Sequence, residues 1–285
     1  MNADLGSYGD GDLAAMLAEQ AGQHLLSLRS ARFGGGDSLD ALGLKILGDD
    51  ADRTANDLIV GSLKKLRPFD AILSEESTDD LARLDADRVW IVDPLDGTRE
   101  YKMDGNQEWA VHIALWERYG ASHSAASGTA PLDAVGRLTL GVVGLPVLGL
   151  VLRSDQPVAP APLPVALPAV RLRMVRSGSR VQPLASGVAA LLGWDEVSMG
   201  SAGAKAMAVV RGEADAYIHT GGQWEWDSAA PVIVAQANGL FVARIDGSPM
   251  LYNQRDTFLP DLLICRADLA DRVMAAVRQV LPTLL

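Results

Sequence analysis

The chain has 285 residues, of which 48% are hydrophobic, so it can bury a large core and is not a disordered protein. Its 36 acidic and 25 basic side chains leave a formal net charge of −11, which excludes a general basic surface for nucleic acid or for an anionic membrane. A small anionic ligand, held by a few local cations or by bound metal, is still compatible with that charge.

The sequence also argues against several other classes of protein. The single cysteine, Cys265, cannot form an internal disulfide, and no group of cysteines and histidines has the spacing of a zinc or iron–sulfur site. The polar, acidic N-terminus lacks the layout of a signal peptide. The longest apolar run, Gly141–Leu152, contains glycine and proline and is too short to span a bilayer. We therefore expect a cytoplasmic protein that has neither membrane nor nucleic acid polymer as a partner.

Apolar spacing in the first half of the chain predicts two helices and four strands. We expect a helix from Asp10 to about Ser30, with Asp10 or Asp12 as its N-cap. The Gly- and Asp-rich stretch Arg32–Asp52 is expected to form a loop or a weak hairpin, and helical periodicity resumes over Asn56–Lys65. The predicted strands are residues 71–73, 89–92, 109–116 and 138–151.

The second half begins with a proline- and alanine-rich stretch, Gln156–Val170, which predicts an extended connector. The pattern then predicts strands at 172–175 and 214–218, and helices at 183–192, 202–211, 228–238 and 267–280. Strands and helices alternate in both halves, so we expect a layered α+β fold with two sheet-containing lobes, residues 1–155 and 156–285.

The sequence DPLDGT carries the clearest chemical signal in the chain. An apolar strand ends in two carboxylates, Asp93 and Asp96, three residues apart across a turn. This spacing lets both carboxylates and the carbonyl oxygen of Leu95 face one point, and such hard oxygen ligands suit Mg²⁺ or Mn²⁺. The backbone N–H groups of Gly97 and Thr98 follow, where the start of a helix would attract an anion. Taken alone, the same residues would form an ordinary turn.

Two distant acidic residues also lie at the ends of predicted elements. Glu75 follows the strand at 71–73 after one intervening residue, and Asp227 lies near the start of a helix between aromatic and small residues. Each one alone is explained by a solvated loop or a helix cap. Together with Asp93 and Asp96 they indicate one site built from three parts of the chain.

The motifs SEE, WIVDPLDGT and WDSAA, in this order and at these separations, resemble the signature of the inositol monophosphatase superfamily of metal-dependent phosphatases. The resemblance spans the chain from the first predicted helix to the last and implies the layered αβαβα sandwich of that family. It implies that two or three Mg²⁺ ions bind to five residues, namely Glu75, Asp93, Leu95 (through its carbonyl), Asp96 and Asp227. It also implies inhibition by Li⁺.

The resemblance further assigns catalytic roles to Thr98, Asp96 and Glu75. Gly97 and Thr98 would bind the scissile phosphate, and Thr98 would also polarise the attacking water. No covalent enzyme intermediate is required, because the metal ions would activate that water and stabilise the leaving oxygen.

One element departs from the family pattern. The family carries T-x-A-D before its second helix, with the Asp as proton acceptor for the catalytic Thr. We align this element with D-R-T-A-N, which places Asn56 where that Asp would be. Asn cannot accept a proton at neutral pH. Either one of three nearby acids (Asp49, Asp50 or Asp52) accepts the proton, or Asn56 only orients Thr98 and solvent accepts it.

The second half of the chain indicates the substrate. G-S-A-G-A-K opens a predicted helix and resembles the G-S-x-x-K element of the family branch that hydrolyses 3′-phosphoadenosine 5′-phosphate (PAP). R-S-G-S-R resembles the S-R-S-H element of that branch, with Arg180 where His is commoner. An exposed Trp224 or Trp226 could stack on a purine ring. The expected substrate-binding residues are Gly97, Thr98, Arg176, Ser177, Arg180, Ser201, Lys205 and His219.

These resemblances imply a Mg²⁺-dependent 3′(2′),5′-bisphosphate nucleotidase, which converts PAP to AMP and phosphate in sulfur assimilation. Inositol 1-phosphate or fructose 1,6-bisphosphate is the alternative substrate, as main or side activity. A third hypothesis, from another class, is a catalytically weak PAP-binding regulator in which Asn56 has replaced the proton acceptor. The family includes monomers and homodimers, and the sequence leaves both open.

Overall fold

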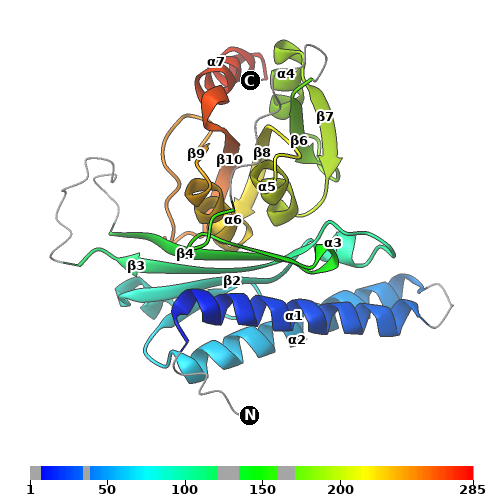
Figure 1. Ribbon diagram of the computed structural model, residues 1–285, viewed down its shortest axis with the longest axis vertical. Coiled ribbons are helices and arrows are strands. Elements are labelled where there is room, and N and C mark those ends of the chain that lie inside the picture. Colours follow the sequence, from blue (N-terminus) through cyan, green and yellow to red (C-terminus); the bar gives the residue numbers. More distant parts are fainter. Residues whose placement is uncertain (1–7, 35–38, 121–134, 159–170, 285) are drawn as a thin grey trace.

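The computed structural model describes residues 8–34, 39–120, 135–158 and 171–284, which form two five-stranded mixed sheets with helices around and between them (Figure 1). The first sheet, in the order β1-β2-β3-β4-β5, consists of β1 (Ala71–Ser74), β2 (Arg88–Asp96), β3 (Ala110–Arg118), β4 (Gly136–Leu145) and β5 (Leu150–Arg153). The second sheet, in the order β7-β6-β8-β10-β9, consists of β6 (Arg173–Ser177), β7 (Asp195–Met199), β8 (Ala216–Trp224), β9 (Leu240–Ala243) and β10 (Phe258–Arg266).

Helices lie on the outer face of each sheet and between the two sheets. They are α1 (Asp10–Phe33), α2 (Ala41–Leu66), α3 (Thr98–Tyr101), α4 (Pro183–Leu192), α5 (Ala202–Val210), α6 (Glu225–Ala237) and α7 (Ala270–Val280). Short 3₁₀ turns occur at η2 (Leu81–Asp85), η3 (Pro146–Leu148), η4 (Ala267–Leu269) and η5 (Leu281–Thr283). Figure 1 shows α1 and α2 below the first sheet, α5 and α6 between the sheets, and α4 and α7 at the opposite end. This αβαβα order confirms the predicted fold class.

Three hydrophobic cores hold these layers together, and single strands contribute to two of them. Successive residues of a strand point to opposite faces of its sheet. In β2, Trp90 packs in the core under α1 and α2, while Ile91 packs in the core shared with α5 and α6. In β8, Tyr217 belongs to that central core, while Ile218 packs against α4 and α7. Both sheets are therefore covered on both faces.

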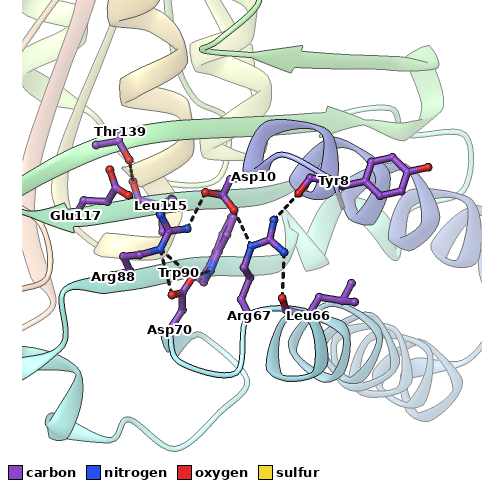
Figure 2. Close-up of polar contacts among 10 residues, drawn as sticks. All are labelled: Tyr8, Asp10, Leu66, Arg67, Asp70, Arg88, Trp90, Leu115, Glu117 and Thr139. Carbon is purple, nitrogen blue, oxygen red and sulfur yellow. Dashed lines mark hydrogen bonds and ion pairs between the residues drawn. The ribbon is translucent and has the colours of Figure 1, made fainter. Parts of the chain in front are cut away.

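Asp10 joins the start of α1 to the first sheet and to the end of α2 (Figure 2). Its two carboxylate oxygens accept hydrogen bonds from Arg67 and Arg88, each at 2.7 Å. Arg88 also pairs with Glu117 at 2.6 Å, and with Asp70 at 3.1 Å. This half-buried network fixes the start of α1 and the end of α2 against the start of β2, at the opposite end of that strand from Asp93 and Asp96.

Two predictions near the N-terminus are wrong. The N-cap of α1 is Gly9, and no side chain caps that helix. The stretch Arg32–Asp52 is neither loop nor hairpin over its described residues, because α2 begins at Ala41 and is capped by the Asp40 carboxylate. Buried residues recur at every fourth position of α2 and begin within this Gly- and Asp-rich stretch; they are Leu47, Ala51, Ala55, Ile59 and Leu63. This buried stripe against α1 stabilises a helix that composition alone did not suggest.

The remaining predicted elements are confirmed with shifts at their ends. The predicted strand 138–151 is two strands, β4 and β5, because Pro146 interrupts it with a 3₁₀ turn. β7, β9 and β10 were not predicted. The connector Gln156–Val170 lies mostly outside the described residues. The division at residues 155 and 156 stays a prediction, although each sheet takes its strands from one side of it. Among the described helices, none combines the length and apolar content that crossing a bilayer requires.

Candidate active site

Strand pairing brings Glu75 beside the acidic end of β2. β1 and β2 run parallel, with Ser74 opposite Val92, so the residues that follow these two positions lie at the same edge of the sheet. The N–H of Glu75 donates to the carbonyl oxygen of Val92 at 3.2 Å. Asp93 therefore lies next to Glu75, as the sequence predicts.

An irregularity in β2 positions the second aspartate. The pairing of β2 with β3 shifts between Asp93 and Asp96, and the Asp93 carboxylate accepts the N–H of Leu95 at 3.1 Å. Gly97 follows with φ +90°, a left-handed conformation that side chains rarely adopt, and α3 begins directly after it. A Cβ at Gly97 would also lie 3.0 Å from the carbonyl oxygen of Glu108. The turn therefore requires glycine at this position.

Asp227 reaches the same place from the second half of the chain. It is the third residue of α6, and its carboxylate accepts the N–H of Trp224 at 2.6 Å. One carboxylate oxygen from each of Asp93, Asp96 and Asp227 lies within 4.8 Å of the other two. We refer to Glu75, Asp93, Asp96 and Asp227 as the acidic cluster.

Burial, reinforced by mutual repulsion, raises the pKa of three carboxyls of the acidic cluster. Burial raises the pKa of Asp93 well above its ordinary value, and the neighbouring Glu75 and Asp96 add to this effect. Burial and Asp96 raise the pKa of Asp227 to about 6. Glu75 keeps exposed surface, but the surrounding protein excludes much of the water and, with Asp227, raises its pKa to about 8. Oxygen donors that repel one another in this way fit a divalent cation, which would offset the repulsion.

Asp96 is the member of the acidic cluster whose pKa is lowered. Burial acts to raise its pKa, but His112 and Lys205 hold it below its ordinary value. His112 Nε2 lies 3.3 Å from an oxygen of Asp96. The same carboxylate accepts the Ser201 hydroxyl and, at 2.6 Å, the N–H of Gly203 at the start of α5. Asp96 thus connects the acidic cluster to the helix that carries the predicted substrate residues.

Sequence reasoning missed His112. It is buried in the middle of β3, and its Nδ1 lies 3.2 Å from the carbonyl oxygen of Trp226 at the start of α6. A single polar residue within the otherwise apolar run Trp109–Trp116 is the signal that could have identified it. Its packing is tight, because a Cβ at Gly203 would lie 2.1 Å from Nε2 of this imidazole.

The structure decides which residue is paired with Thr98. The Thr98 hydroxyl oxygen lies 3.2 Å from an oxygen of Asp52 and 3.2 Å from the carbonyl oxygen of Leu95. Burial and the nearby Glu76 raise the pKa of Asp52 to about 7, against the opposing effect of the Thr98 hydrogen bond. Of the three acids considered from the sequence, Asp52 is the one that contacts Thr98.

Asn56 does not contact Thr98. Its side chain accepts the Ser74 hydroxyl at 2.7 Å and donates to Ser77 at 3.4 Å. The alternative in which Asn56 orients Thr98 is therefore wrong, and so is the premise that Asn56 stands in the position of the proton acceptor. Because α2 begins at Ala41, Asp52 lies near the middle of that helix, where it faces α3.

A cavity of about 430 Å³ opens beside the acidic cluster, between the two halves of the chain. Most of the predicted site residues line it, which are Glu75, Asp96, Gly97, Ser177, Arg180, Ser201, Lys205, His219 and Asp227. Residues not predicted to bind substrate also line it, among them Glu100, Tyr217, Gln223 and Phe258. Trp224 lines the cavity as well and is 45% exposed, whereas Trp226 is half-buried.

The predicted substrate residues differ in what they contact. Arg180 donates to the carbonyl oxygen of Gly222 at 3.0 Å, and His219 Nε2 lies 2.9 Å from the same oxygen. The Lys205 ammonium is buried and donates to the carbonyl oxygens of Gly200 and Ser201, and burial lowers its pKa to about 8. Lys205 therefore supports the turn before α5 as well as facing the cavity.

Arg176 lies elsewhere. It does not line the cavity; its guanidinium pairs with Glu196 of β7 and donates to the carbonyl oxygen of Ser177 at 3.1 Å. Arg176 points away because it is next to Ser177 on β6, and neighbouring strand residues face opposite sides. The expectation that Arg176 binds substrate is not supported by this position.

Comparisons with known proteins find relatives that match most of the chain. A family model described as the inositol monophosphatase family matches residues 13–281. A Mycobacterium leprae protein named 3′-phosphoadenosine 5′-phosphate phosphatase is 47% identical over 275 residues, covering 95% of this chain and 94% of that protein. The 3′(2′),5′-bisphosphate nucleotidase CysQ of Escherichia coli is 30% identical over 216 residues, covering 73% of this chain and 80% of that protein.

Solved structures share the fold. CysQ from Bacteroides thetaiotaomicron, described as a bacterial member of the inositol monophosphatase family, has a TM-score of 0.67 at 27% identity and covers 91% of this chain and 98% of that one. An inositol monophosphatase from Thermotoga maritima has a TM-score of 0.68 at 19% identity, over 96% of this chain and 98% of that one. The second likeness bears on the fold alone.

Proposed function

Because the chain belongs to the inositol monophosphatase family, a family of metal-dependent phosphatases, we propose that it is a Mg²⁺-dependent phosphatase that hydrolyses the 3′-phosphate of PAP to give AMP and phosphate. The observation that carries this proposal is the cavity, in which the acidic cluster meets Ser177, Arg180 and Ser201 from the second half of the chain. The relative that is 47% identical and named as a PAP phosphatase supports the choice of substrate.

The acidic cluster and the carbonyl oxygen of Leu95 would hold the metal. Asp93 is buried and Asp227 half-buried, the charge of Asp96 acts on both, and Glu75 lies at the cavity wall. Bound Mg²⁺ would lower the pKa of a water molecule and neutralise charge on the phosphate and on the leaving oxygen. His112 and the start of α5 keep Asp96 ionised, so that it is available as a ligand without losing a proton.

Thr98 and Asp52 would handle the proton of the attacking water. When the Thr98 hydroxyl donates to Asp52, its oxygen is free to accept a hydrogen bond from water, which orients that water in the site. A proton that passes to Thr98 can then move to the Asp52 carboxylate. A carboxyl whose pKa is about 7 is well matched to accept a proton near neutral pH.

The remaining cavity residues would bind the nucleotide. Backbone N–H groups of Gly97 and Thr98 would bind the scissile phosphate, and the hydroxyls of Ser177 and Ser201 would bind the ribose or the second phosphate. Arg180 is the exposed cation of the cavity wall and would attract the second phosphate. The hypothesis of a catalytically weak regulator was based on the replacement of the proton acceptor by Asn56. Because Asp52 contacts Thr98, that basis no longer applies.

A direct comparison of substrates tests the proposal. Phosphate release would be measured from PAP, inositol 1-phosphate and fructose 1,6-bisphosphate, with Mg²⁺ and with chelator. We expect a kcat/KM for PAP at least about tenfold above both sugar phosphates, which corresponds to about 1.4 kcal/mol of transition-state discrimination. We also expect Li⁺ to inhibit at millimolar concentrations. A preference for either sugar phosphate would refute the choice of substrate and leave the metal site in place.

A further inference from the structure

Resting on the proposed function, we infer that Trp224 and Phe258 form an aromatic wall that binds the adenine ring and sets the preference of the site for a nucleotide over a sugar phosphate. Both side chains line the cavity that adjoins the acidic cluster. They come from neighbouring strands, β8 and β10, where Trp224 is paired directly with Phe258. The aromatic wall is therefore part of the cavity and not a separate surface patch.

An irregularity in β8 directs Trp224 into the cavity. On a regular strand alternate residues share a face, so Trp224 would lie on the opposite face from Tyr217 and His219, which line the cavity. The register between β8 and β10 shifts at Gly221 and Gly222, where two residues of β8 oppose one of β10. This bulge reverses the alternation and brings Trp224 to the same side as the other two. Both glycines have positive φ, +96° and +88°, as the bulge requires.

The ring geometry leaves aromatic surface available to a ligand. Trp224 and Phe258 are each 45% exposed, so both rings keep surface that a ligand can cover. Their ring centroids are 5.7 Å apart with an interplanar angle of 78°, so the two rings form a corner. Trp226 stacks near-parallel to Trp224 at 5.7 Å and 17°, which fixes the indole in place. A Cβ at Gly222 would lie 2.4 Å from the Phe258 ring, so the ring packs closely over bare backbone.

The chemistry of the cavity matches a base at this corner. The part of the cavity near the acidic cluster is charged and hydroxyl-rich, with Glu75, Asp96 and Ser201, and suits phosphate, metal and sugar hydroxyls. The aromatic wall is the apolar part, and neither inositol nor fructose has a flat apolar group to place against it. A purine ring does, and it stacks on aromatic side chains with a gain that depends little on hydrogen bonding.

The test compares PAP with an abasic analogue, methyl ribofuranoside 3,5-bisphosphate, which keeps both phosphates and the ribose. The ratio of kcat/KM for PAP to kcat/KM for the analogue would be measured for the wild type with Mg²⁺ and for Trp224→Leu and Phe258→Leu. We expect each substitution to lower this ratio, and Trp224→Leu to lower it about tenfold, chiefly through KM for PAP. Phe69→Leu is the matched control, because Phe69 is 97% exposed and outside the cavity, and it should leave the ratio unchanged.

The outcomes separate this inference from the proposed function. If the wild type prefers PAP and both variants, shown to be folded by thermal unfolding, keep the wild-type ratio, the aromatic wall is refuted and the proposed function stands. If the wild type releases no phosphate from PAP, the proposed function fails, and binding of AMP against ribose 5-phosphate by calorimetry tests the wall alone. The aromatic wall is supported if the wild type binds AMP more tightly than ribose 5-phosphate and if Trp224→Leu or Phe258→Leu weakens the binding of AMP. Equal affinities of the wild type for AMP and ribose 5-phosphate would overturn it. If either Trp224→Leu or Phe258→Leu fails to fold, the other variant tests the aromatic wall.

Discussion

Replacing Asp52 by Asn separates proton acceptance from geometry at the proposed site. The Asn side chain has the same shape and keeps a carbonyl oxygen 3.2 Å from the Thr98 hydroxyl, but it cannot accept a proton at neutral pH. We therefore expect kcat for PAP to fall by about 10²–10⁴, the usual contribution of a general base, with little change in KM. Steady-state phosphate release at saturating Mg²⁺ would measure both constants.

The pH dependence of the same variant provides a second readout. Asp52 has a pKa of about 7 in the folded protein, and it accepts a proton only when ionised, so wild-type kcat/KM should rise with pH through about 7. Asp52→Asn should lose this limb. Folding raises the pKa of Asp52 from 3.8, so its ionisation destabilises the folded protein progressively from about pH 4 to pH 7. The variant should therefore have the higher Tm above pH 7, and the difference should vanish below pH 4.

Asn56→Ala is the matched control. It removes the hydrogen bond from the Ser74 hydroxyl at 2.7 Å and leaves Thr98 and Asp52 untouched. We expect a loss of about 1 kcal/mol in the free energy of unfolding and a change in kcat below about threefold. If Asn56→Ala lost activity and Asp52→Asn kept it, the assignment of Asp52 as proton acceptor would be refuted.

Three further predictions concern metal binding and packing. Chelation of the metal should lower Tm at pH 8 but hardly at pH 5. Asp227 and Glu75, with pKa values of about 6 and about 8, are protonated at pH 5, so they neither repel their neighbours nor bind metal there. Calorimetry at both pH values would measure the change in Tm. Asp10→Ala should lower the free energy of unfolding by about 1–3 kcal/mol in urea titrations without changing kcat, because two arginines lose their acceptor. Gly203→Ala should destabilise by about 1–3 kcal/mol, because its Cβ would lie 2.1 Å from His112, whereas Gly61→Ala, with open space around it, should not.

Much of the site could be predicted from local sequence. The acidic cluster could be predicted because each member lies at the end of a strand or in the first turn of a helix. Strand pairing then places Glu75 beside Asp93. His112 and Phe258 could not be predicted in the same way. His112 lies within an apolar strand and Phe258 begins β10, and only the pairing of β3 with β2 and of β8 with β10 brings them to the site.

The error at Asn56 has a physical origin in α2. Because a loop was predicted up to residue 52, Asp52 was not assigned to a helix. The alignment of D-R-T-A-N with the family element therefore depended on residue types alone. In the structure, the buried residues at intervals of four begin at Leu47, and the Asp40 cap starts the helix at Ala41. That extension orients Asp52 toward Thr98, while Asn56 lies one turn further along and contacts Ser74. Recognising the Leu47–Leu63 stripe would have given the correct partner.

The central claim is that the acidic cluster supports metal-dependent hydrolysis of PAP, and one measurement tests it most directly. Phosphate release from PAP would be followed for the wild type and for Asp93→Asn, each with Mg²⁺ and with excess chelator. We expect turnover of PAP only by the wild type with Mg²⁺, and we expect the Asp93→Asn protein to be folded. Turnover by Asp93→Asn equal to that of the wild type, or undiminished turnover in chelator, would contradict the account.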